Sequence, residues 1–166
     1  MPEMPSPTCR PPLVLWGVLA AAVWQSAGLW TDLDSPYLVG GLPALVLWSC
    51  PVALWWLGPG PRLWNRRPGQ ILVWLALLCL LGGILADLNV LRHGALAFSL
   101  AALWSWRRER LLWLAGAALW LPAGGWAACR MINFPPNVLM GLRVAVAILL
   151  ALFGAWSVAR EKGWRT

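Results

Sequence analysis

The chain has 166 residues, of which 60% are apolar and 11% are charged, and its formal net charge is +7. Soluble domains are about 45–50% apolar, so this composition excludes an ordinary soluble protein and predicts a polytopic membrane protein. The positive charge does not predict nucleic-acid binding, because the basic residues form small clusters between apolar runs, as the positive-inside rule describes.

Six apolar runs separated by short polar segments predict an all-α transmembrane helix bundle, with six spans arranged in three hairpins. The predicted spans cover residues 13–30, 37–57, 71–86, 94–106, 111–128 and 138–158. Three regions follow from this pattern: an unstructured Pro-rich tail over 1–12, a transmembrane domain over 13–158 and a basic tail over 159–166.

The basic residues divide unevenly between the two sets of alternate loops. One set holds ten of the thirteen, and the other set holds three basic and three acidic residues: Arg92, Arg130, Arg143, Asp32, Asp34 and Asp87. Basic residues accumulate on the cytoplasmic side of short loops. We therefore predict a multi-pass protein of the inner membrane with both termini in the cytoplasm.

Ten of the fifteen tryptophans fall near the predicted cytoplasmic side. They are Trp16, Trp55, Trp56, Trp64, Trp74, Trp104, Trp106, Trp113, Trp156 and Trp164, and Trp30 and Trp126 mark the outer edge. An indole has an apolar body and a polar N–H, which suits the headgroup region. We expect these residues to anchor and pack the bundle, and a cage that stacks on a ligand is the alternative.

Three residues near the predicted outer face are candidates for chemistry. Arg143 lies inside the sixth apolar run, where it either reaches the headgroups, pairs with Asp87, Asp32 or Asp34, or faces a cavity that holds an anion. His93 is either an interfacial residue bonded to a backbone carbonyl or a general base. Cys129 is either a small interfacial residue or a nucleophile, because the adjacent positive charge favours a thiolate.

As a catalytic set, Cys129 would attack, His93 would accept the proton, and Arg143 or Arg130 would stabilise an oxyanion. Neither a metal nor a cofactor is predicted. The four cysteines lack the spacing of a metal site, there is a single histidine, and no Gly-rich phosphate-binding loop is present.

Four segments, 29–48, 83–104, 111–126 and 134–154, carry a hydrophobic cadence that resembles the membrane region of exosortase/archaeosortase proteins. Tyr37 and Gly40 or Gly41 follow the first outer loop, as in that family. The resemblance implies a multi-span enzyme that cleaves C-terminal sorting tails from exported proteins with an outer-face cysteine, arginine and histidine.

The chain departs from the catalytic pattern of that family. The family cysteine lies in an Ala-Cys-Ser-Gly-like stretch and precedes the arginine and then the histidine. Here Cys129 is followed by Arg130 and Met131, and His93 comes before the cysteine. The departure favours a non-catalytic or accessory member.

Two functions of different classes follow. The first is a non-catalytic membrane protein that works in the cell envelope beside a membrane-protein partner or an exported protein tail, with small-residue stretches at 82–83, 95–97, 116–118 and 124–125 allowing close helix approach. The alternative is a divergent outer-face thiol peptidase or transpeptidase. A small transporter or channel is less favoured, because no acidic residue lies inside a predicted span.

Overall fold

The computed structural model describes residues 11–27, 39–58, 64, 66–104 and 110–163, without the side chains of Arg66 and Arg110. These residues form helices and no strand, which confirms the all-α prediction. The elements are α1 (Leu13–Gln25), α3 (Gly41–Leu57), α4 (Arg66–Leu85), α5 (Asn89–Leu103), α6 (Arg110–Ala115), the 3-10 helix η1 (Gly116–Leu119), α7 (Pro122–Met131) and α8 (Pro136–Glu161).

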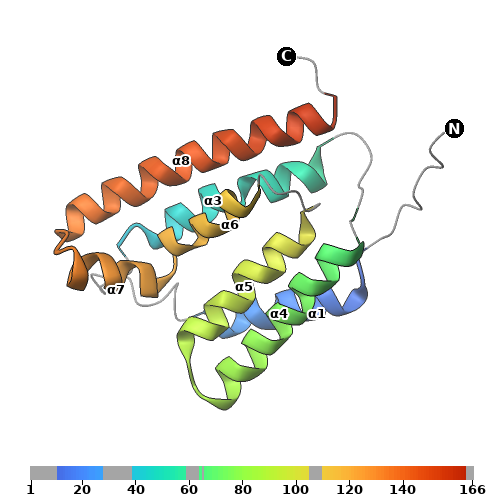
Figure 1. Cartoon of the computed structure of the whole chain (residues 1–166), viewed down its shortest axis with the longest axis horizontal. Helices are drawn as coiled ribbons and strands as arrows, with labels where there is room; N and C mark the ends of the chain where they lie inside the picture. Colours follow the sequence, from blue (N-terminus) through green and yellow to red (C-terminus); the bar gives the residue numbers. More distant parts are fainter. Residues whose placement is uncertain (1–10, 28–38, 59–63, 65, 105–109, 164–166) are drawn as a thin grey trace, which may run out of the picture.

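The helices pack in two groups that lie side by side (Figure 1). In the first group, α4 and α5 form a hairpin and α1 packs against both. In the second group, α3 packs along α8, and α6, η1 and α7 pack beside them. Contacts between α3 and α5 join the two groups.

Helices α3, α5 and α8 end at the same end of the molecule. The Trp56 indole, near the end of α3, donates a 2.9 Å hydrogen bond to the carbonyl of Leu103, the last residue of α5. Lys162, just after α8, donates to the carbonyls of Trp55 at 2.6 Å and Gly58 at 2.9 Å. These donors satisfy carbonyls that a helix C-terminus leaves without partners.

Helices α1 and α4 begin at that same end. Trp16 in the first turn of α1 makes an edge contact with Trp56, with ring centroids 5.9 Å apart. Trp64, which precedes α4, donates a 2.9 Å hydrogen bond to Ala102 in the last turn of α5. Successive helices α1, α3, α4 and α5 therefore alternate in direction.

Two of the described helices are long and apolar enough to cross a membrane, namely Arg67–Leu85 and Pro136–Glu161. The count rises to three if the bent pair Leu111–Leu119 and Pro122–Met131 is one span. The predicted fifth span over 111–128 is bent, because these two pieces meet at an angle of 68°. Leu121 is extended where it precedes Pro122, since proline disfavours helical backbone in the preceding residue.

Four buried indoles pack together where the second group meets the end of α5, and we call Trp48, Trp104, Trp113 and Trp120 the tryptophan core. Each is at most 2% exposed. Trp48 stacks on Trp113 at 4.0 Å and tilts against Trp120 at 5.6 Å, and Trp104 meets Trp113 edge-on at 4.9 Å. Trp104 and Trp113 therefore serve in internal packing.

Other tryptophans are exposed. Trp16, Trp74 and Trp156 are 43%, 63% and 55% exposed, so their rings are available to headgroups or lipid. Trp30, Trp106 and Trp164 are outside the described residues. The predicted internal packing by tryptophans is confirmed, and their anchoring at a membrane interface stays a prediction.

The two stacked rings of the tryptophan core also exchange hydrogen bonds. The Trp48 indole N–H donates to the carbonyl of Trp113 at 2.6 Å, and the Trp113 indole N–H donates to the carbonyl of Trp48 at 2.9 Å. A buried indole N–H needs an acceptor, because leaving it without one costs its full desolvation. This reciprocal pair joins the middle of α3 to α6.

Glycines set the distance between α8 and its neighbours. A Cβ on Gly154 would lie 2.6 Å from the Cβ of Pro51 on α3 and 3.3 Å from the Trp104 ring. A Cβ on Gly116 would collide with the Leu150 side chain. The predicted close approach at small residues is therefore confirmed inside the bundle, for Gly116 among others.

Replacing Gly154 with Ala should destabilise the bundle by roughly 1–3 kcal/mol, because the added methyl group has no room beside Pro51. Gly141→Ala on the same helix is the matched control, since a Cβ there meets nothing within 4 Å. Apparent unfolding temperature in detergent measures both. Equal unfolding temperatures for the two variants would contradict the close contact between α8 and α3.

Trp48→Phe and Trp113→Phe should each lower the free energy of unfolding by about 1 kcal/mol. Each change deletes one of the reciprocal hydrogen bonds and keeps an aromatic ring in place. The double variant should lose less than the sum, since the two rings share one contact. Trp74→Phe, at an exposed ring, is the control. Strict additivity of the two losses would argue against the pair.

Candidate functional site

Arg143 is the most deeply buried charged residue that the structure describes, with 1% of its surface exposed. Its Nη1 donates a 2.7 Å hydrogen bond to the carbonyl of Val39, immediately before α3. Its Nη2 is buried and has no hydrogen-bond partner among the described residues. Because arginine keeps its proton in proteins, a full positive charge lies inside the second group of helices.

The Arg143 side chain is buried between helices and does not extend along the surface of the protein. Pairing with Asp87 does not explain it, because Asp87 is 88% exposed and forms an ion pair with Arg92. Asp32 and Asp34 lie outside the described residues. What the structure shows is a guanidinium that holds the backbone turn at the start of α3.

The backbone at the start of α3 packs closely against α8 and the end of η1. Gly40 adopts φ +74°, a conformation that glycine takes without strain, and a Cβ there would lie 3.1 Å from the Met140 backbone. A Cβ on Gly41 would lie 3.3 Å from the Trp120 carbonyl oxygen and 4.0 Å from Arg143 Nη1. We call Val39, Gly41, Trp120 and Arg143 the Arg143 corner.

Cys129 lies on a helix that neighbours the one carrying Arg143. It belongs to α7, which packs against α8, and its side chain is half-buried. Arg130, the other candidate cation, is exposed.

His93 lies in the first group of helices. It is on α5, which packs against α1 and α4, and it is 5% exposed. Its Nδ1 is buried without a hydrogen-bond partner among the described residues, as are the hydroxyls of Ser26 and Ser99. The structure thus places Arg143 and Cys129 in one group and His93 in the other, and the three-residue catalytic set stays a prediction.

The sequence analysis missed several residues that carry the architecture. Trp48 and Trp120 lie inside apolar runs, which could have indicated core positions, but ring stacking across helices has no signature in one sequence. Lys162 was predicted only as part of a basic tail, and it binds the end of α3. Its four methylenes and its place just after a long helix are the signal for such a cap.

No group of three or more metal-ligating side chains comes together within the part of the chain that the structure describes. Comparison of the chain with models of known protein families, with curated proteins and with solved structures finds no match.

The division of His93 and Cys129 between two groups predicts that a cysteine at position 93 will not crosslink to Cys129. The experiment oxidises a variant with His93→Cys in a background where the other natural cysteines are replaced. Gly82→Cys with Leu91→Cys is the positive control, since a Cβ on Gly82 lies 3.3 Å from the Leu91 side chain. Efficient crosslinking of position 93 to Cys129 would show that the two helices meet.

Proposed function

We propose that the chain is an integral membrane protein that crosses the inner membrane six times, with both termini in the cytoplasm. We propose further that it works in the cell envelope as a non-catalytic or accessory protein resembling exosortase/archaeosortase proteins. The observation that carries the membrane part is a shell of exposed large apolar side chains. Leu13, Trp74, Leu78, Leu149 and Leu152 are each more than 60% exposed.

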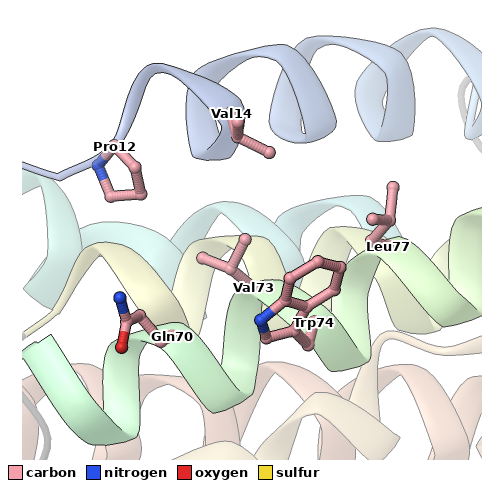
Figure 2. A pocket seen from close by; sticks show the side chains of 6 residues that line it. All are labelled: Pro12, Val14, Gln70, Val73, Trp74 and Leu77. Atoms are coloured by element: carbon pink, nitrogen blue, oxygen red, sulfur yellow. The ribbon is translucent and has the colours of Figure 1, made fainter.

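Such a shell is costly in water, at about 25 cal/mol for each Å² of apolar surface, and it is the expected surface of a helix in lipid. A groove of about 190 Å³ lies on this shell between the start of α1 and α4. In Figure 2, Pro12 before α1 and Val14 of α1 lie on one side of the groove. On the other side lie Val73, Trp74 and Leu77 of α4, with Gln70 at one end. The groove has the apolar lining that an acyl chain requires.

The alternating helix directions support six crossings, because each successive span must return across the bilayer. Helices α1, α3 and α5 have 13, 17 and 15 residues, which makes them roughly 20–25 Å long at 1.5 Å per residue. A typical hydrocarbon core is about 30 Å thick. Crossing by these helices therefore requires local thinning of the bilayer, which costs only a fraction of a kcal/mol per Å.

The non-catalytic part of the proposal is supported by what the candidate residues do. Arg143 donates to the backbone that begins α3, and His93 packs in the group of helices that lacks Cys129. Both residues thus have places in the packing of their own groups. The proposed partners are the lipid bilayer and either another membrane protein or an exported protein tail, which would meet the exposed apolar faces of α4 and α8.

A divergent thiol peptidase or transpeptidase is the second candidate, and the packing of α7, which carries Cys129, against α8, which carries Arg143, favours it. In that case Cys129 would attack a carbonyl carbon and Arg143 would stabilise the oxyanion. Such an enzyme also needs a base near the thiol, which is the role predicted for His93. Crosslinking between positions 93 and 129 separates this candidate from the first.

Labelling single cysteines with an impermeant maleimide tests the orientation. In a background without natural cysteines, Arg130→Cys should be labelled in intact spheroplasts and Arg160→Cys only after lysis. The two positions are a matched pair, since both are exposed arginines near helix ends. Labelling of both from the same side would contradict an odd number of crossings between them.

Affinity purification in mild detergent at native expression levels tests the accessory role. The proposal predicts that a membrane protein or an exported protein co-purifies at a fixed ratio, and that Cys129→Ala leaves this ratio unchanged. Recovery of the monomer alone would count against a partner. Loss of a processed product in the Cys129→Ala strain would favour the enzyme instead.

A further inference from the structure

The positive charge of Arg143 has no compensating anion among the described residues. Its Nη1 is bonded to a neutral carbonyl, and its buried Nη2 has no partner there. A buried charge is stable when an opposite charge or several hydrogen bonds offset its desolvation. A guanidinium inside a membrane protein that lacks this compensation indicates a site where an anion binds.

A helix N-terminus lies beside this guanidinium. Helix α3 begins at Gly41, where a Cβ would lie 4.0 Å from Arg143 Nη1. This helix has neither a side-chain cap nor an acidic residue in its first turn. The unpaired N–H groups and the dipole of a helix N-terminus both favour an anion.

The break between η1 and α7 lies beside the start of α3. The Trp120 carbonyl oxygen lies 3.3 Å from the position of a Cβ on Gly41, so the broken helix reaches the start of α3 at this residue. Trp120 also carries a buried indole N–H without a partner among the described residues.

We propose that the Arg143 corner binds a phosphate oxyanion, supplied either by the headgroup of an anionic lipid or as free phosphate. The planar guanidinium presents paired N–H donors that match two phosphate oxygens. The corner lies at the start of α3, beside the N-terminal part of α8. The inference goes beyond the proposed function and does not depend on a partner protein.

Binding at Nη2 requires local movement, because Arg143 is 1% exposed. The regular helix is already interrupted at the joint of Leu121 and Pro122, next to Trp120 of the corner. A shift of α7 about this joint would open the corner without breaking the tryptophan core. Cys129 lies on α7 and therefore reports such a shift through its rate of maleimide labelling.

The experiment measures binding to the full-length protein in a neutral detergent by native mass spectrometry and thermal unfolding. The probes are inorganic phosphate, phosphatidylglycerol and, as the neutral comparison, phosphatidylcholine. The variants are Arg143→Gln, Arg143→Lys and the matched control Arg130→Gln, whose arginine is exposed. A variant in which Cys129 is the single cysteine adds the labelling rate.

The wild type and Arg130→Gln should bind one equivalent of phosphatidylglycerol, and Arg143→Gln should bind it roughly tenfold more weakly because a charge-assisted hydrogen bond is lost. Arg143→Lys should fall between them. Competition by inorganic phosphate identifies a free anion as a sufficient ligand, and its failure to compete identifies the lipid as the source; both outcomes support the site.

Three results would overturn the proposal. If the wild type binds phosphatidylglycerol no better than phosphatidylcholine and phosphate has no effect, the protein has no specific site for a phosphate oxyanion. Equal affinity in the wild type and Arg143→Gln removes Arg143 from the site. If Arg143→Gln does not fold, the labelling rate of Cys129 in the otherwise wild-type protein decides. A rate that changes neither in saturating phosphate nor in phosphatidylglycerol overturns the proposal.

Discussion

The reciprocal hydrogen bonds between Trp48 and Trp113 are the interaction on which the second group of helices depends. Each indole N–H finds its acceptor on the backbone of the other residue, so two buried donors are satisfied while the rings stack at 4.0 Å. Inside a bilayer, apolar burial gives little preference for one helix pairing over another, since lipid is as apolar as the side chains. Directed indole bonds supply the specificity that hydrophobicity cannot, and they fix α6 against the middle of α3.

The remaining geometry of this group follows from that fixed contact. With α6 held on α3, η1 continues to Trp120, whose carbonyl lies beside Gly41 at the start of α3. Helix α8 then packs along α3 through Gly154 at one end and through the hydrogen bond from Arg143 to Val39 at the other. Lys162 closes the end of α3 beyond Gly154. The buried charge of Arg143 is thus set at a corner where α3 begins and η1 ends.

Apolar runs of helical length predict the all-α class of this fold, which the described residues confirm, whereas the orientation predicted from the basic clusters stays a prediction. They predict less about each helix. Hydropathy predicts one span from 111 to 128, but Pro122 and the extended residue before it interrupt the helix. The two pieces meet at 68°, and the backbone of Gly124 packs directly against Ala118 at the bend. Trp104 and Trp113 read as interfacial by position, but their burial depends on partners on other helices. Arg143 was identified as a candidate from its place in an apolar run, whereas its backbone acceptor lies 104 residues away and has no signal in the sequence.

The distance between the Arg143 guanidinium and the Val39 carbonyl in a lipid bilayer tests this account most directly. Solid-state NMR of protein labelled with ¹⁵N in arginine side chains and ¹³C in valine carbonyls measures it, with Arg143→Lys used to assign the signal. We predict a direct contact consistent with the 2.7 Å hydrogen bond and slow exchange of the guanidinium protons with water. A guanidinium that shows no contact with Val39 and exchanges rapidly with water would contradict a buried charge at this corner.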